Sequence, residues 1–193
     1  MGSRSANPES TRLTSSEATE TLAQTADRLF YPAGVNGVSL AAIRDDSGLS
    51  FRRIYKICPS KDDLISLWLR TRHQSWSSAF AEVVDRELAA GSTPVDAVFN
   101  TVRAWMLETN FRGCGFINTY AEIAEPTDEH VEIIRDHKHS FATYLDRIVV
   151  HGDALAVLID GAIVQASMFS SLEPIERARS LAETHEASYP KPS

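Results

Sequence analysis

Residues 39–61 read SLAAIRDDSGLSFRRIYKICPSK, a pattern that predicts two short helices separated by a tight turn. Ser39 is a favourable N-cap for the first helix, because its side-chain oxygen can accept a backbone N–H at the open helix end. Gly48 supplies the positive φ at which that helix can stop. Ser50 then caps a second helix, over residues 51–57. Two helices joined by a short glycine-containing turn form a helix-turn-helix.

The second of these helices has a basic surface. It carries Arg52, Arg53 and Lys56, with Lys61 just beyond its end, and residues 47–61 contain no acidic residue. A basic helix in this motif can enter the major groove of DNA with its first residues nearest the base edges. There an arginine can form two hydrogen bonds to guanine, worth about 1–3 kcal/mol of discrimination. The segment therefore predicts binding to double-stranded DNA.

Residues 29–64 as a whole resemble the DNA-binding domain of the tetracycline-repressor (TetR) family of bacterial regulators. Residues 112–145 and 158–166 resemble the ligand-binding and dimerisation half of one TetR subgroup. The resemblance implies a homodimer that releases DNA when an effector binds the body. In the DNA-binding part, the matching positions follow one another without gaps over 36 residues: Leu29, Phe30, Gly34, Ser39, Ile43, Gly48, Ser50, Tyr55, Pro59, Ser60, Lys61 and Leu64.

The candidate DNA contacts fall into two groups. Residues 50–53 lie at the start of the second helix, where base contacts are made. Tyr55, Lys56 and Lys61 match TetR-family positions that hold phosphates. Ser39 is a further candidate for phosphate, although its capping role accounts for it without DNA. For Tyr55 the alternative is a packed aromatic, and for the arginines a solvated surface. The predicted DNA-binding residues are Ser39, Ser50, Phe51, Arg52, Arg53, Tyr55, Lys56 and Lys61.

The charge of the chain is distributed unevenly. The net charge of the 193 residues is −7, which taken alone disfavours binding to nucleic acid. Residues 1–61 contain eight Lys or Arg and six Asp or Glu, a net charge of +2, whereas residues 62–193 contain eleven and twenty, a net charge of −9. This asymmetry suits a DNA-facing part on an acidic body, and chance clustering of surface charge is the alternative.

Hydrophobic residues recur at helical spacing along the rest of the chain, and no segment has the alternation expected of a strand. We therefore predict an all-α fold, with an N-terminal three-helix bundle containing the helix-turn-helix and a C-terminal six-helix bundle. The predicted divisions are a disordered arm (1–14), a DNA-binding domain (15–60), a ligand-binding and dimerisation domain (61–188) and a loose tail (189–193).

Turn residues set the expected helix ends in the body. The helix that begins after residues 113–115 is expected to include Ile123 and to stop at Pro126. The next helix is expected to include Ile148 and to end around Gly152. The last two helices are expected over about 153–170 and 174–188.

Residues 155–169, LAVLIDGAIVQASMF, are apolar on nearly every side of the predicted helix. The stretch is too short to cross a bilayer, and Asp160 and Gln165 would be costly there. A helix that is apolar all round needs cover on every side, and a second subunit is the natural source in a chain of this size. Together with the resemblance, this predicts a homodimer formed through residues 153–188 and no membrane partner.

Large aromatic side chains cluster on three consecutive helical segments of the body. Pockets for small molecules are mostly apolar and lie between the helices of bundles, so the cluster predicts an effector site. Asn118, Tyr120 and His137 are the candidate polar partners. Few basic residues lie near in sequence, which favours a neutral or cationic hydrophobic effector. The alternative is that the aromatics only fill the core. The predicted ligand-binding residues are Trp105, Met106, Phe111, Phe116, Tyr120, His137, Phe141 and Tyr144.

Enzyme chemistry finds no support in the sequence. There is no GxSxG, P-loop or GxGxxG pattern, and no cofactor or metal is predicted. One helix carries an acidic, histidine-rich stretch that lacks the spacing of a metal site, and we interpret it as a solvated helix face. The residues of this stretch are Asp128, His130, Glu132, Asp136, His137 and His139.

Two cysteines, Cys58 and Cys114, without zinc spacing suggest a reducing compartment, and the N-terminal stretch lacks the apolar core of a signal peptide. The predicted location is the cytoplasm. The predicted function is ligand-responsive repression of transcription, by a homodimer that binds a palindromic operator. The alternatives are a helical bundle that binds a small molecule without acting on DNA, and a metal-dependent helical enzyme.

Overall fold

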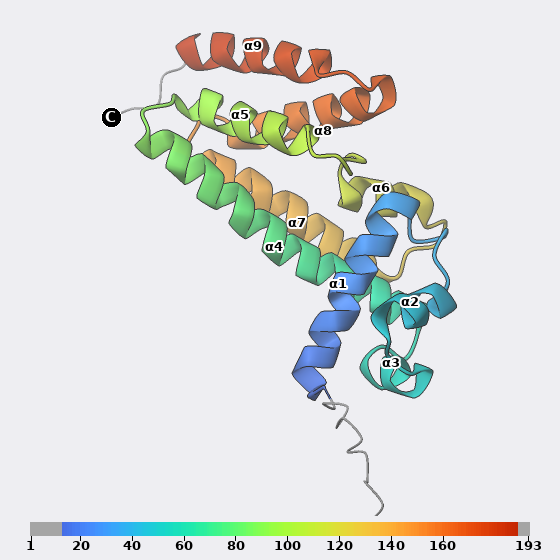
Figure 1. Ribbon diagram of the computed structural model, residues 1–193. Helices are drawn as coiled ribbons and strands as arrows, with labels where there is room; N and C mark the ends of the chain where they lie inside the picture. Colours follow the sequence, from blue (N-terminus) through green and yellow to red (C-terminus); the bar gives the residue numbers. More distant parts are fainter. Residues whose placement is uncertain (1–12, 189–193) are drawn as a thin grey trace, which may run out of the picture.

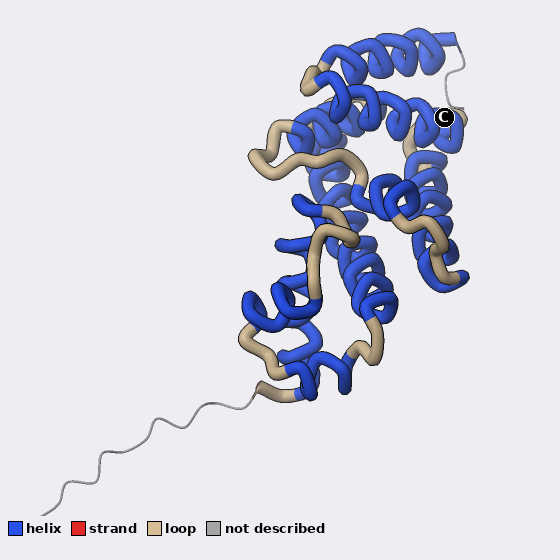
Figure 2. Tube along the Cα trace, turned by 90° about the vertical axis from the view of Figure 1, so that its right-hand side faces the viewer, coloured by secondary structure: helices blue, strands red, loops and turns tan. Residues whose placement is uncertain are grey.

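The computed structural model describes residues 13–188, and all regular structure in that range is helical (Figures 1 and 2). This confirms the predicted all-α fold. Most of the predicted arm and the whole predicted tail lie outside the described residues. The helices are α1 (Ser15–Ala33), α2 (Leu40–Ser47), α3 (Phe51–Ile57), α4 (Lys61–Ala89), α5 (Pro94–Met106), α6 (Gly115–Glu122), α7 (Asp128–Asp146), α8 (Gly152–Phe169) and α9 (Glu173–Ser188).

The first three helices pack around the start of α4 (Figure 1). Phe30 of α1 meets Trp68 of α4 edge to face, with ring centroids 5.5 Å apart. Ile43 of α2 and Ile54 of α3 are fully buried beside them. Each of these short helices is amphipathic, so burial of one apolar face fixes it and leaves its polar face in water.

Helix α4 joins this N-terminal unit to the rest of the molecule. Its 29 residues extend for about 43 Å at 1.5 Å per residue. Helix α5 packs on the C-terminal part of α4, α7 follows α4 from its first turn onward, and α8 packs between α7 and α9. Figure 1 shows α5, α8 and α9 at the end of the molecule opposite α3. One continuous helix therefore reaches from the helix-turn-helix into the core of the body.

Helices α2, α3, α4, α5 and α7 each begin after a capping residue, as predicted for Ser39 and Ser50. Side-chain oxygens of Ser39, Ser50, Ser60, Thr93 and Thr127 each accept an amide of the helix that follows. Such caps satisfy N–H groups that the helix itself cannot pair. Local sequence was therefore sufficient to place these helix starts.

Two helix ends differ from the prediction. Helix α6 stops at Glu122, which leaves Ile123 outside it, and α7 stops at Asp146. The early end of α7 has a packing reason. A Cβ atom at Gly152 would lie 2.2 Å from the backbone nitrogen of Asp146, so the start of α8 is pressed against the end of α7. The chain must leave α7 before Ile148 to allow this approach.

The interpretation of the histidine-rich stretch of α7 as a solvated face was wrong for His130 and His137, whereas its acidic residues are exposed. His130 and His137 are 0% and 3% exposed. Residues seven apart share one face of a helix, and this face of α7 packs on α4, which buries both rings. His139 remains exposed. Within residues 13–188, no group of three His, Cys, Asp or Glu side chains is placed to hold a metal ion.

Helix α8 has the length and mean hydropathy of a membrane span, and it is the one described helix that does. Core helices of proteins in water meet the same criterion. One side of α8 faces the body, with Leu155, Ile159 and Ile163 buried. On the other side Val157 and Met168 are 74% and 75% exposed. This chain therefore covers one apolar side of α8 and leaves apolar side chains exposed on the other.

Candidate DNA-binding surface and effector cavity

Helices α2 and α3 are held at a fixed angle by a short turn. Gly48 ends α2 with φ of +68°, a conformation that glycine adopts without strain. Leu49, next in the chain, is buried at 6% exposure. Ser50 then accepts the backbone N–H of Arg53 at 3.3 Å and starts α3. A salt bridge of 2.6 Å between Arg28 of α1 and Asp46 adds a surface link to this unit.

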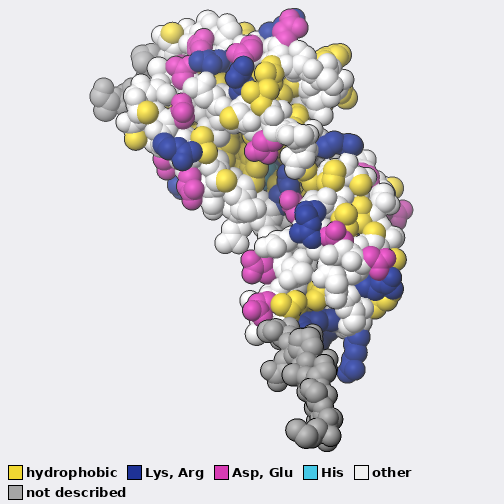
Figure 3. Space-filling view, in the orientation of Figure 1, with side chains coloured by type: hydrophobic (Ala, Val, Ile, Leu, Met, Phe, Trp, Pro, Cys, Tyr) yellow, Lys and Arg dark blue, Asp and Glu magenta, His cyan; other side chains and the backbone are white. Residues whose placement is uncertain are grey.

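The outer face of α3 is polar and basic. Arg52, Tyr55 and Lys56 are exposed there, opposite the buried Ile54. Phe51 is half-buried, and its ring stacks with that of Tyr55 at a centroid distance of 6.2 Å. Figure 3 shows dark blue Lys and Arg side chains at the end of the molecule where Figure 1 has α3. The surface therefore offers positive charge and hydrogen-bond donors.

Four of the predicted DNA-binding residues line one open groove between α3 and the starts of α1 and α4. They are Ser50, Arg52, Arg53 and Lys56. Among the three basic residues of this set, Arg53 has side-chain partners inside the protein, since its guanidinium donates to the carbonyl of Thr14 at 2.7 Å and to that of Leu13. The other predicted residues lie beside this groove: Ser39 at the cap of α2, Phe51 and Tyr55 on α3, and Lys61 as first residue of α4.

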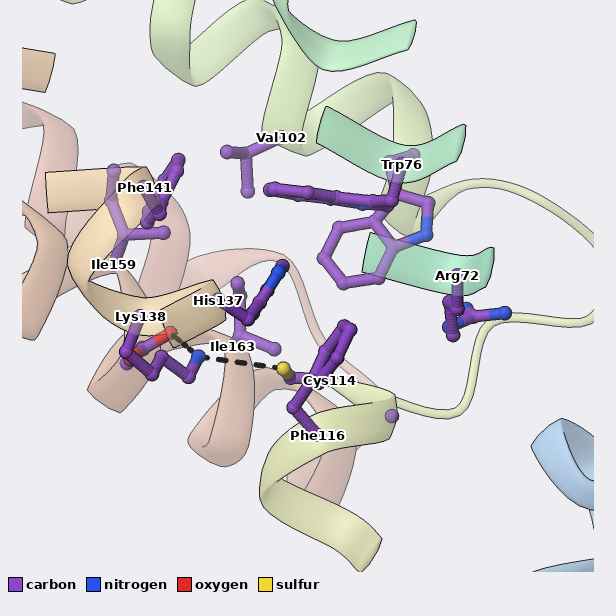
Figure 4. Close-up of a pocket in the computed structure, with 13 residues that line it drawn as sticks. Arg72, Trp76, Val102, Cys114, Phe116, His137, Lys138, Phe141, Ile159 and Ile163 are labelled. Carbon is purple, nitrogen blue, oxygen red and sulfur yellow. Dashed lines mark hydrogen bonds and ion pairs between the residues drawn. The ribbon is translucent and has the colours of Figure 1, made fainter. Parts of the chain in front are cut away.

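A small cavity lies in the body between α4, α5, α7, α8 and the start of α6 (Figure 4). Its volume is about 20 Å³, little more than one water molecule needs and far below the 300–1,000 Å³ typical of ligand pockets. Aromatic contacts fill the space around it. Trp76 lies 4.9 to 5.8 Å from the rings of Phe80, His137, Phe141 and Trp105, measured between centroids. In this conformation the cavity is therefore too small for a ligand of typical size.

The cavity wall contains polar groups among these rings. Lys138 forms a 2.7 Å ion pair with Asp160, and its Nζ lies 3.4 Å from Sγ of Cys114. His137 stacks on Phe116 with centroids 3.6 Å apart, and its Nδ1 lies 3.0 Å from Nδ1 of His73. Burial, aided by the charge of Lys138, lowers the pKa of His137 to about 3, so its imidazole is neutral at physiological pH.

Solved structures with this arrangement of helices are transcriptional regulators. A TetR-family regulator from Streptomyces coelicolor superposes with a TM-score of 0.68 at 22% identity, over 86% of this chain and 96% of its own. One from Chloroflexus aurantiacus gives 0.72 at 22% identity, over 90% and 96%. One from Cytophaga hutchinsonii gives 0.74 at 16%, over 92% and 97%. The chain has the TetR-family fold. No protein-family model matches the sequence, and no curated protein matches it significantly.

In this TetR-family fold, the cavity is connected to α1 through Arg72. Arg72 lines the cavity, and its guanidinium lies 3.8 Å from the ring centroid of Tyr31 and 2.6 Å from Asp27. The hydroxyl of Tyr31 donates to the carbonyl of Gly113 at 3.0 Å and accepts the N–H of Arg112 at 3.1 Å. One cluster of contacts therefore joins α4, α1 and the segment before α6.

Two further contacts link the N-terminal unit to the body. The carboxylate of Glu122, at the end of α6, accepts the N–H groups of Val35 and Asn36 at 3.0 and 2.6 Å. Nε2 of His130 in α7 lies 3.0 Å from the carbonyl oxygen of Asp62 in the first turn of α4. Both contacts join segments far apart in the sequence, and each touches an element adjoining the helix-turn-helix.

The predicted ligand residues separate into two sets. Trp105, Phe116, His137 and Phe141 line the cavity. Of the others, Met106 is buried outside it, Phe111 packs on Trp105, Tyr120 is 55% exposed, and Tyr144 packs on Phe80. Asn118, a candidate polar partner, donates instead to the carbonyl of Arg112.

Sequence reasoning missed the charged lining of the cavity. Arg72 and Lys138 are basic and lie against it, contrary to the expectation that few basic groups are near. Their charges are paired with Asp27 and Asp160. Asp160 gave a usable signal, because an acidic residue within an apolar helix needs a buried partner. Cys114 and Trp76 carried no comparable signal.

Proposed function

We propose that this chain is a DNA-binding transcriptional regulator that acts as a homodimer, represses from a palindromic operator and responds to a small effector. The observation that carries the proposal is the α2–α3 pair, whose exposed face presents Arg52, Tyr55 and Lys56. In this proposal residues 15–60 form the DNA-binding part, and residues 61–188 bind the effector and the second subunit.

The roles at the DNA follow from exposure. The side chain of Arg52 is exposed near the start of α3 and, among the described residues, forms no hydrogen bond, so it is the best candidate to read a base edge. Lys56 and Tyr55 lie further along the helix and suit phosphates, which position a protein without reading sequence. Lys61 begins α4, where exposed amides also attract phosphate. Arg53, bound to the carbonyls of Leu13 and Thr14 just before α1, requires a partial change of partners to contact DNA.

The proposed dimer is supported by an apolar surface on the last two helices. Val157, Met168 and Phe169 of α8 are 74%, 75% and 69% exposed, and Leu181 of α9 is 62% exposed. Exposed apolar side chains gathered on one pair of helices indicate an interface, and a two-fold pairing is the commonest solution. A dimer of this kind can hold two copies of α3 roughly 34 Å apart, one turn of DNA.

Effector control is supported by the contacts of the cavity wall. Arg72 lies between the cavity and Tyr31 of α1, and Glu122 holds the loop before α2. A ligand that needs a wider cavity favours a conformation with those contacts altered, and DNA affinity then falls by linkage. The two unpaired cysteines are consistent with the reducing cytoplasm.

The test is an electrophoretic mobility shift against the DNA upstream of the chain's own coding sequence. We expect the unmodified protein to retard this DNA at nanomolar to tens-of-nanomolar concentration, as specific regulators do at physiological salt. The double variant Arg52→Ala/Lys56→Ala should lose at least tenfold in affinity. Arg177→Ala removes a positive charge from exposed α9 and should bind as the unmodified protein does. Equal loss in both variants, or no retardation at all, would refute the proposal.

A further inference from the structure

Cys114 places a nucleophilic atom in the wall of the cavity. The residue is 7% exposed and sits at the N-cap of α6, where its side chain makes no capping hydrogen bond. Its Sγ lies 3.4 Å from Nζ of Lys138 (Figure 4). An ammonium group beside a thiol stabilises the negative charge that sulfur carries when it attacks an electrophile. Lys138 is held in place by Asp160 at 2.7 Å.

A second observation at the same cavity points to a ligand with a polar atom. His137 is 97% buried and lines the cavity, and its Nδ1 faces His73. Among the described residues, its Nε2 has no hydrogen-bond partner. In the tautomer that carries its proton on Nε2, with Nδ1 accepting from His73, the neutral imidazole can donate the Nε2 N–H to a carbonyl oxygen. The stacked ring of Phe116 and the edge of Trp76 enclose this position and suit a flat, conjugated molecule.

The size of the cavity restricts how such a ligand can be held. A volume of about 20 Å³ has room for about one water-sized group, so the walls must move to admit even a small ligand. The free energy of non-covalent binding is limited by the number of ligand atoms, so a molecule this small would bind weakly by contacts alone. A covalent bond removes that limit.

We infer that Cys114 captures a small α,β-unsaturated carbonyl compound, and that the adduct is the effector of the proposed regulator. In the reaction the thiol releases its proton to solvent, and sulfur forms a bond to the β-carbon. The carbon–carbon π pair forms a double bond between the α-carbon and the carbonyl carbon, and the carbonyl π pair moves to oxygen, which gives an enolate. A proton from solvent then adds to the α-carbon, and the carbonyl re-forms. Atoms and electrons balance without an oxidant or reductant.

Direct contacts connect the site of the adduct to the N-terminal unit. Cys114 follows Gly113, whose carbonyl accepts the Tyr31 hydroxyl, and Arg72 lies both against the cavity and over the Tyr31 ring. Added atoms cannot fit a filled core without displacing its walls. Displacement of residues 113–116 therefore acts on α1 through Tyr31. This step rests on the proposed function, whereas capture of the electrophile does not.

The experiment treats the full chain with acrolein, and with propanal as a matched aldehyde that lacks the double bond. Adducts are located by peptide mass mapping after brief exposure. The second cysteine is an internal reference, because burial raises the pKa of Cys58 to about 11. We expect Cys114 to gain one acrolein at least about tenfold faster than Cys58. Cys58→Ser should keep this reaction and Cys114→Ser should lose it.

Variants at the neighbouring lysine test why the thiol reacts. Lys138→Met should slow the addition about tenfold, whereas Lys138→Arg, which keeps the charge, should react nearly as the unmodified protein does. Because Lys138→Met leaves Asp160 unpaired, its melting temperature is measured first. The arginine variant keeps the test decisive if the methionine variant does not fold.

The DNA measurement is kept separate from the adduct measurement. Acrolein, but not propanal, should weaken DNA binding at least tenfold, and Cys114→Ser should be insensitive to both. The inference is overturned if Cys114 reacts no faster than Cys58, or if the adduct forms and DNA affinity is unchanged. A protein that never binds DNA refutes the proposed function instead, while the mapping still decides whether Cys114 is the capture site.

Discussion

Replacement of Glu122 by alanine should destabilise the junction between the body and the N-terminal unit. The Glu122 carboxylate accepts two backbone N–H groups, from Val35 at 3.0 Å and from Asn36 at 2.6 Å. The side-chain amide of Asn36 also donates to the backbone carbonyl of Glu122 at 2.9 Å, and this bond survives in the variant. The substitution therefore removes two charge-assisted hydrogen bonds and little else.

The size of the effect follows from the burial of the two donors. Val35 is 0% exposed, so its N–H group has poor access to water once the carboxylate is removed, whereas that of exposed Asn36 can be rehydrated. A hydrogen bond to a charged group contributes about 1.5–3 kcal/mol, and an unsatisfied buried donor costs about 1–3 kcal/mol. We therefore expect a loss of about 2–3 kcal/mol, which lowers Tm by roughly 4–12 °C in a chain of this length.

The assay is urea unfolding at a fixed protein concentration, since association would make stability concentration-dependent. Glu125→Ala is the matched control, because Glu125 is exposed in the following loop, and surface changes usually stay within about 0.5 kcal/mol. Equal stability of the Glu122 and Glu125 variants would refute the reasoning.

A double-mutant cycle with Gly34 sharpens this prediction. A Cβ at Gly34 would lie 2.6 Å from the Glu122 carboxylate, and the residue has φ of +79°. Gly34→Ala should therefore lower the free energy of unfolding more in the unmodified protein than in the Glu122→Ala background. In that background the clash with the carboxylate is absent and only the backbone strain remains.

Three other predictions test the surface, the assembly and the core. Arg52→Ala should relax base specificity. Lys56→Ala should instead weaken binding evenly across DNA sequences and reduce the slope of log affinity against log salt concentration by about 0.9. Identical behaviour of the two variants would contradict their separate roles. Val157→Asp should give monomers in sedimentation velocity with an unchanged helical spectrum, and a monomeric unmodified protein at micromolar concentration would remove the proposed interface. The pKa of His137 is lowered to about 3, by burial first, so the unfolded chain gains a proton near pH 6.5 that the folded chain does not. Stability should therefore fall by up to about 1.4 kcal/mol per unit as pH drops from about 6.5 toward 3, and a His137→Phe variant that keeps the full slope would show that another group is responsible.

Local sequence determined the helices and the helix-turn-helix. The capping serines and the positive φ of Gly48 act within a few residues, so the starts of α2, α3 and α4 could be predicted without knowledge of the fold. Helical periodicity also predicted the all-α class, because the apolar stripe of a helix can be recognised within a single segment of the sequence. The Arg52 and Lys56 side chains belong to the same local pattern, which is why their exposure was foreseen.

Tertiary structure alone decided the cavity and the contacts that connect it to the N-terminal unit. Lys138 meets Asp160 across 22 residues of sequence, and Glu122 meets Asn36 across 86. No local propensity encodes such pairs, because they form only when two helices pack at one particular angle and register. The burial of His137 was also beyond local sequence, because its helical spacing fits an exposed face and a buried face equally well. Packing of α7 on α4 and α6 placed its ring against His73 and Phe116, and burial there keeps its imidazole neutral.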